Sequence, residues 1–312
     1  MYNPFNIISS FRLSFLPPLM IYLAAGVSGL TNIVGLFFVK EYLDLSAAFL
    51  AGLGFWAGLP WVLKMPLGHI VDLIWKFKSI LVFFGALIMA ISSLIMYFLI
   101  AHKEEMISVL NAETWFIIST LLAPIGFVLQ DVVADALTVE AIPKTDEKGN
   151  EIDFKTLKSL NVVMQLLGRV SIISGTLIVS FINLIMFSDS SEMSDNEKIV
   201  TYGKIYLYSL IVPIISIMGV VFSYISSKSR LNKLIKNGLT FEKAFNLIYP
   251  VLKATKPNKS IITGSIIFVI FTLSIGISKI PFSQEIVFIG SFLIIVYLLM
   301  TLSNQLDAVS KR

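Results

Sequence analysis

Eight long apolar stretches constrain the fold of this 312-residue chain more than any other feature of its sequence. A helix needs about 20 mostly apolar residues to cross roughly 30 Å of hydrocarbon. Such windows cover residues 14–38, 45–68, 79–101, 114–138, 160–187, 203–226, 260–278 and 285–304. They lack the alternation of barrel strands, and lipid leaves an open sheet edge unsatisfied. The windows therefore predict an all-α integral membrane protein.

Composition agrees and excludes other classes. Only 14% of the residues are charged and the mean hydropathy is +0.85, whereas soluble domains carry about 25% charged residues. With no cysteine and two histidines, the chain offers no disulfide and no thiolate- or histidine-based metal site. No nucleophile–base pair or phosphate-binding glycine loop is present, so we expect neither an enzyme nor a bound cofactor. The first window lacks a cleavage pattern, which indicates a retained span.

Basic residues predict the orientation. With the N-terminus inside, inner segments hold 17 of the 24 lysines and arginines and outer segments hold five. The positive-inside rule then places both termini in the cytoplasm, and we expect a multi-pass protein of a bacterial inner membrane. The net charge of +4 requires no nucleic-acid partner, because anionic lipid headgroups can meet the inner basic loops.

The windows also predict the domain organisation. Residues 1–226 form a six-helix half, residues 227–259 a basic amphipathic connector on the cytoplasmic surface, and residues 260–312 two further helices. Six helices, a long basic inner loop and more helices follow the plan of the major facilitator superfamily, in which two halves are repeats. We therefore expect a major-facilitator-like bundle with an incomplete C-terminal half.

Four charged residues fall at similar depth near the inner ends of predicted spans. These are Lys64, Asp131, Asp135 and Arg169, two of each sign. Charges in spans are costly and normally face the bundle interior in pairs. Three interpretations stay open: the basic pair neutralises the acidic pair structurally, an aspartate exchanges a proton, or the basic pair contacts an anionic substrate.

Polar residues at helical spacing indicate a water-filled cavity beside these charges. The three stripes are Asp131, Asp135 and Thr138; Asn161, Gln165 and Arg169; and Ser28, Asn32 and Gly35. Trp56 is an interior ring that could stack on a flat ligand, although packing is the simpler interpretation. Glu140 is expected to be a solvated loop edge.

Small residues and a proline predict local helix geometry. Gly54 with Gly58, and Ala25 with Gly29, are small-xxx-small pairs that we expect to pack against neighbouring helices. Pro60 is expected to bend the second window just before Lys64.

Several ordered motifs resemble the folate-biopterin transporter family of the major facilitator superfamily. They are PWVLKMPLGHIVD at residues 60–72, the first-helix stretch 26–51, DVVADALTVE at 131–140 and GRVSIISG at 168–175. Met65 and Val71 depart from that pattern, which has proline and serine there. The cytoplasmic latch that this motif makes in facilitators corresponds here to Gly68, Asp72, Lys76 and Lys78.

The block from Gln130 to Asp135 and the following IPKTDEKG are nearly as similar to muropeptide permeases of the AmpG type. The resemblance implies proton-coupled symport of an anionic, folate- or pterin-like solute by alternating access. Its implied substrate-binding residues are Arg169, Lys64, Gln165, Asn32 and Trp56, with Asp131 and Asp135 coupling protons. Because eight helices do not complete two halves, the alternatives are a fragment that needs its missing half or a partner subunit, and a non-transporting assembly protein.

Overall fold

The computed structural model describes residues 11–38, 46–143, 151–188, 192–248, 257–278 and 280–310. Within these ranges the regular structure is helical, and eight segments are long and apolar enough to cross a membrane. They are Leu13–Leu36, Ala47–Leu73, Ser79–Ala101, Ala112–Ala141, Phe154–Met186, Asp195–Lys236, Lys259–Gly276 and Ser283–Thr301. Each overlaps one predicted window, which confirms the prediction of a multi-pass helical membrane protein.

Contacts divide the chain into two units, and each is described on its own. The first unit comprises Met1–Leu45 and Lys76–Lys253, and the second comprises Ser46–Trp75 and Ala254–Arg312. The first contains η1 (Leu13–Phe15), α2 (Leu16–Val27), α3 (Leu30–Phe38), α6 (Ser79–Ala101), α7 (Lys103–Val109), α8 (Ala112–Ala141), α9 (Phe154–Met186), α10 (Asp195–Tyr208), α11 (Ile211–Lys236) and α12 (Phe241–Ile248). The second contains α4 (Ala47–Gly58), η3 (Leu59–Leu63), α5 (Lys64–Leu73), α13 (Lys259–Ile277) and α14 (Ser283–Ser310). The predicted boundary after residue 226 falls inside α11.

Capping side chains explain where the long helices begin. The N-cap residues are Asn111 for α8, Asp153 for α9, Ser194 for α10 and Asn258 for α13, and each side chain accepts a backbone N–H of the first turn. Such caps satisfy N–H groups that have no partner within the helix. The apolar windows do not include these polar first turns. As a result, α9 begins six residues before residue 160, where the predicted window begins.

The first two spans are interrupted helices. Residues 28 and 29 form a turn between α2 and α3, and the Ser28 hydroxyl donates to the Ala25 carbonyl at 2.6 Å. In the second span α4 ends at Gly58, and a 3₁₀ segment containing Pro60 leads into α5 at Lys64. The α-helix is thus interrupted at Pro60, because the proline ring cannot continue an α-helical hydrogen-bond ladder.

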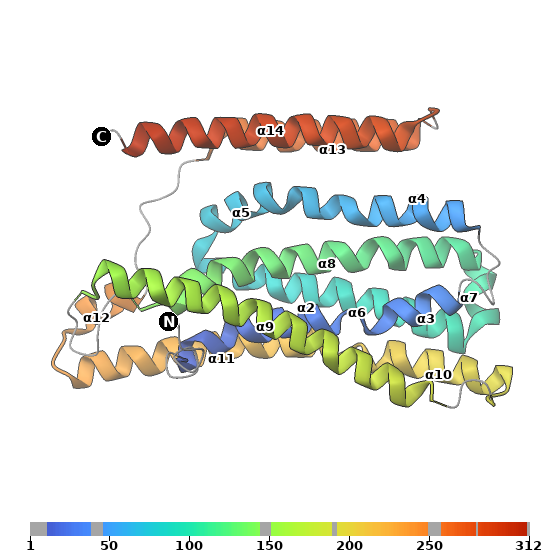
Figure 1. Cartoon of the computed structure of the whole chain (residues 1–312), viewed down its shortest axis with the longest axis horizontal. Helices are drawn as coiled ribbons and strands as arrows, with labels where there is room; N and C mark the ends of the chain where they lie inside the picture. Colours follow the sequence, from blue (N-terminus) through green and yellow to red (C-terminus); the bar gives the residue numbers. More distant parts are fainter. Residues whose placement is uncertain are drawn as a thin grey trace, which may run out of the picture. The chain divides into compact units, whose positions relative to one another are not determined.

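Small residues hold α6 against α8 in the first unit. A Cβ on Gly85 would lie 2.5 Å from the Gly126 carbonyl oxygen, and one on Gly126 would lie 2.6 Å from that of Gly85. About two turns along, the Ser92 hydroxyl donates to the Ser119 carbonyl at 2.8 Å, and the Ser119 hydroxyl donates to the Ser92 carbonyl at 2.9 Å. The two helices run alongside each other in Figure 1. Backbones this close require the absence of larger side chains.

The glycines that pack closely in the described residues differ from the predicted pairs. At Gly54 and Gly58 an added Cβ would meet no described atom within 4 Å, so neither packs closely on another helix of the second unit. At Gly29 the nearest atoms belong to its own turn. The close approach of α2 to α9 is instead made by Gly26 and Gly175, each of which faces the backbone of the other helix.

In the second unit, helices α4 and α5 are joined to α13 and α14 by specific contacts. The Trp56 ring packs on Gly276, where a Cβ would lie 2.7 Å from the ring edge. His69 Nε2 accepts the backbone N–H of Asn258 at 2.9 Å. A side chain of α5 thus satisfies a backbone donor at the N-cap of α13.

Candidate functional site

A hydrogen bond between Tyr22 and Asp135 joins the first and fourth spans. The Tyr22 hydroxyl of α2 donates to Asp135 Oδ1 of α8 at 2.6 Å. The tyrosine is 8% exposed, whereas the aspartate side chain is accessible from outside the protein. A buried phenol normally finds a polar partner, and a bond to a carboxylate is among the stronger kinds.

Two more charges act on the same hydroxyl. The Asp131 carboxylate and the Arg169 guanidinium both lie within electrostatic range of the Tyr22 hydroxyl, together with Asp135. Asp131 is half-buried and Arg169 is exposed. Helices α2, α8 and α9 therefore bring two acidic groups and one basic group to one place in the first unit.

The glycine before Arg169 makes room for this arrangement. A Cβ on Gly168 would lie 3.0 Å from Tyr22 Cε2 and 3.1 Å from Cδ2, so the ring lies directly on the α9 backbone. Any larger residue would displace the ring and its hydroxyl. Gly168 thus leaves space for the tyrosine ring, and the next residue, Arg169, supplies the basic charge.

The polar stripes differ in how they are exposed. Asn161, Gln165 and Arg169 are all exposed along α9, and the cavity predicted beside them stays a prediction. On α8 the stripe divides, because Thr138 is buried and its hydroxyl donates to the Asp135 carbonyl at 2.6 Å. Asn32 is exposed on α3, whereas Gly35 of the same stripe faces the Tyr206 hydroxyl of α10.

Two of the predicted binding residues belong to the second unit. Lys64 is the first residue of α5 and is half-buried. Trp56 lies on α4, with its ring against Gly276 and 5.5 Å from the Phe55 ring. Their predicted place beside Asp131, Asp135 and Arg169 stays a prediction.

The predicted latch residues fall in both units. Gly68 and Asp72 lie on α5 of the second unit, and the Lys76 side chain is outside the described residues. Lys78, at the N-cap of α6, donates to Glu140 Oε1 near the end of α8 at 2.6 Å. Glu140 is therefore an ion-pair partner that ties two helix ends together, and its interpretation as a solvated loop edge is wrong.

Sequence reasoning missed Tyr22 and the Lys78–Glu140 pair. The available signal for Tyr22 was one phenol hydroxyl within an otherwise apolar span, since such a group needs a partner. For Glu140 the signal was weaker, because a carboxylate at the end of a span is often solvated. The ion pair joins residues 62 positions apart, and no local spacing rule predicts such a contact.

Gln130 supplies a further buried polar group next to the acidic pair. Its side chain is 2% exposed, and its amide nitrogen has no hydrogen-bond partner among the described residues. Unsatisfied buried amides are uncommon in folded proteins.

Comparisons with protein-family models, with curated proteins and with solved structures find no match to this chain.

Proposed function

We propose that this chain is a secondary active transporter, which moves an anionic, folate- or pterin-like organic solute by alternating access with proton coupling. One observation carries the proposal: the Tyr22 hydroxyl bonds Asp135 at 2.6 Å, and Asp131 and Arg169 act on that hydroxyl. Ionisable groups within a membrane bundle are characteristic of ion and substrate pathways. The resemblance of the surrounding motifs supplies the substrate class.

Asp135 is the proposed proton carrier. Its carboxylate is exposed while its partner Tyr22 is buried, so a proton can reach the carboxylate without any displacement of the tyrosine. When Asp135 is ionised, it accepts the tyrosine hydrogen bond and links α2 to α8. Protonation removes the charge that favours this bond, so proton binding biases how the two helices are held.

Arg169 is the proposed contact for the solute's anionic group. It is exposed on α9 beside the two carboxylates, and a guanidinium can bind a carboxylate through two parallel hydrogen bonds. Protonation of an aspartate leaves the basic charge less neutralised and strengthens its attraction for an anion. This reciprocal effect is the coupling that a symporter needs.

Uptake into proteoliposomes tests the proposal. Labelled folate, a pterin and a muropeptide would be offered to the purified chain, with and without an inward proton gradient. We expect gradient-dependent uptake of a folate or pterin, and loss of the gradient dependence in Asp135→Asn. Asp195→Asn, which makes the same change at the exposed start of α10, is the matched control and should behave as wild type.

Each other outcome has a definite meaning. Uptake of the muropeptide alone would replace the solute class with that of the AmpG-type permeases. Unaltered pH-dependent uptake in both Asp131→Asn and Asp135→Asn would remove the proton-coupling role. No uptake of any solute by folded protein would leave the charges with the structural role of holding the helices together.

A further inference from the structure

A pocket of about 760 Å³ opens at one end of the first unit, away from the Tyr22 site. It lies where the start of η1, the residues around the start of α9 and the last turns of α11 meet. Its volume falls within the roughly 300–1,000 Å³ typical of small-molecule sites. The residues that line it are therefore a candidate ligand site in their own right.

The charged side chains that the structure describes in this pocket are basic. Arg12, Arg230 and Lys233 line it, and no aspartate or glutamate is among the lining residues that the structure describes. Within the described ranges no carboxylate forms an ion pair with any of the three. Arg12 and Arg230 lie close enough to repel each other. An anion between them would relieve that repulsion and gain charge-assisted hydrogen bonds.

Hydroxyl groups and exposed apolar side chains complete the lining. Thr156, Ser226 and Ser229 can donate hydrogen bonds to an oxyanion. Leu13, Ile225 and Phe222 also line the pocket and are 71%, 54% and 38% exposed. Basic and hydroxyl groups beside exposed apolar side chains match a ligand with an anionic head and an apolar tail.

The positions of its residues in the candidate spans predict that the pocket lies at the depth of lipid headgroups. Its residues begin two candidate spans, Leu13–Leu36 and Phe154–Met186, and occupy the last turns of α11. A helix of 26 residues such as α11 is about 39 Å long, which exceeds the roughly 30 Å of hydrocarbon. Arg230 and Lys233 near its end therefore project into the headgroup layer.

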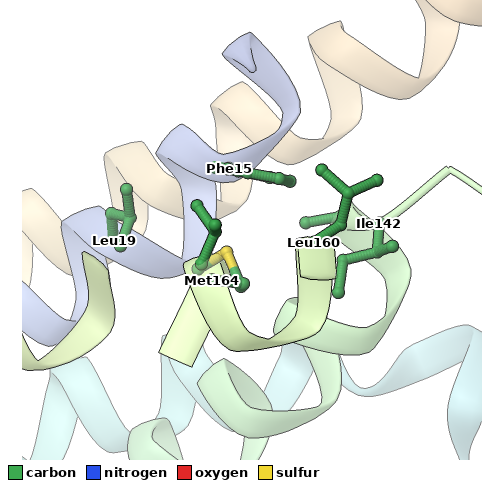
Figure 2. Close-up of a cluster of buried hydrophobic side chains, with 7 residues drawn as sticks. Phe15, Leu19, Ile142, Leu160 and Met164 are labelled. Carbon is green, nitrogen blue, oxygen red and sulfur yellow. The ribbon is translucent and has the colours of Figure 1, made fainter. Parts of the chain in front are cut away.

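A hydrophobic cluster fixes the elements beneath the pocket. Phe15, Leu19, Ile142, Leu160 and Met164 are buried together, and Figure 2 shows them converging from η1, α2, the end of α8 and the first turns of α9. Phe15 directly follows two lining residues, and Ile142 directly precedes a third, Pro143. The Ser14 hydroxyl also donates to the Ala141 carbonyl at 2.8 Å. The base of the pocket is thus held in place without a ligand.

We infer that this pocket binds the phosphate group of an anionic phospholipid, with Arg12, Arg230 and Lys233 holding the phosphate and Leu13, Phe222 and Ile225 contacting the acyl chains. Bound lipid would join the first span to the fifth and sixth at the membrane surface. The inference does not depend on the proposed transport activity, because the pocket shares no residue with the Tyr22 site.

Lipid titration of the full-length chain in detergent, followed by native mass spectrometry, tests the inference. The probes are dioleoylphosphatidylglycerol, zwitterionic dioleoylphosphatidylcholine and inorganic phosphate. We expect the first to bind at least about tenfold more tightly than either of the others. Arg12→Gln/Arg230→Gln should weaken that binding about 30-fold, since each basic group near a lipid surface contributes about a fivefold gain in affinity.

Matched variants separate a pocket from diffuse surface charge. Lys158→Gln/Lys228→Gln removes two exposed basic groups from the same helices, α9 and α11, but neither residue lines the pocket. It should change affinity less than about threefold, because these two charges lie outside the pocket and act on a bound phosphate only through screening solvent. Lys233→Gln, at an exposed position, provides a second test of the pocket in case the double arginine variant does not fold, as judged by its melting temperature.

Three results would overturn the inference. An equal loss of binding in the lysine control would mean that lipid is held by surface charge alone. Inorganic phosphate binding as tightly as phosphatidylglycerol would mean that the apolar side chains contribute nothing and that the ligand is a free phosphate. Retention of wild-type affinity in folded Arg12→Gln/Arg230→Gln would exclude the basic pair as the binding groups.

Discussion

At the residue scale, the Tyr22 hydroxyl is the atom on which the candidate site depends. It bonds Asp135 at 2.6 Å, and substitution by phenylalanine removes this donor while keeping the ring on Gly168. A hydrogen bond to a charged group contributes about 1.5–3 kcal/mol, and the accessible carboxylate can regain part of that from water. We expect Tyr22→Phe to lower the free energy of unfolding by about 1 kcal/mol, measured as a decrease in melting temperature of about 2–4 °C.

The same substitution has a functional consequence that a structural role alone would not produce. Without the donor, the link between α2 and α8 no longer depends on the charge of Asp135, so proton binding cannot bias how the two helices are held. Tyr22→Phe should therefore reduce the stimulation of uptake by an inward proton gradient. Tyr208→Phe removes a phenol hydroxyl at an exposed position of α10 and should leave that stimulation unchanged. Wild-type stimulation in Tyr22→Phe would argue against the Tyr22–Asp135 bond as the coupling element.

At this scale the sequence could predict which polar side chains share a helix face. It could not predict which group each of those side chains would bond. The spacing of Asn161, Gln165 and Arg169 predicted that they share one face of a helix, and α9 carries all three at that spacing. The same rule placed Thr138 with Asp135, yet Thr138 is buried with its hydroxyl on a backbone carbonyl. Threonine can satisfy itself locally, so its presence in a polar stripe does not decide its exposure.

At the element scale, close packing of α6 on α8 depends on two glycines. A Cβ on Gly85 would lie 2.5 Å from a backbone oxygen, and backbone cannot move aside as a flexible side chain can. Overpacking of this kind costs about 1–3 kcal/mol. We expect Gly85→Ala to lower the melting temperature in detergent by several degrees, although alanine by itself favours a helix.

Gly54→Ala provides the control for this prediction. It makes the same chemical change in α4, at a position where an added Cβ meets no described atom within 4 Å. There the higher helix propensity of alanine acts alone and should leave stability unchanged or raise it by about 0.5–1 kcal/mol. Equal destabilisation by both substitutions would mean that the Gly85–Gly126 contact does not limit packing of α6 on α8.

These glycines also show why helix contacts were harder to predict than helices. Gly54 and Gly58 have the four-residue spacing of a packing motif but face no described neighbour, whereas Gly85 and Gly126 pack closely from different helices. Spacing within one helix identifies a smooth face, but which neighbour uses that face depends on the arrangement of all the helices. Apolar length, by contrast, depends only on the local sequence and predicted all eight spans.

At the scale of the whole molecule, the eight spans and the basic loops together determine an expected orientation. The chain contains no cysteine, so a single introduced thiol reports the side of the membrane on which it lies. Glu105 and Asn237 are exposed positions after the third and sixth candidate spans. Three crossings separate them, and an odd number of crossings places two positions on opposite sides.

We expect Glu105→Cys to react with a membrane-impermeant maleimide in intact bacterial cells, and Asn237→Cys to react only after permeabilisation. The reason is that Asn237 follows a cluster of lysines and arginines in the last turns of α11, and such clusters remain in the cytoplasm. The cysteine-free parent chain sets the background. Labelling of Asn237→Cys alone in intact cells would mean that the orientation is inverted. Labelling of both positions from outside would contradict three crossings between them. An inverted protein would also carry the pocket of Arg12 and Arg230 on the outer leaflet, so this measurement decides which leaflet supplies its lipid.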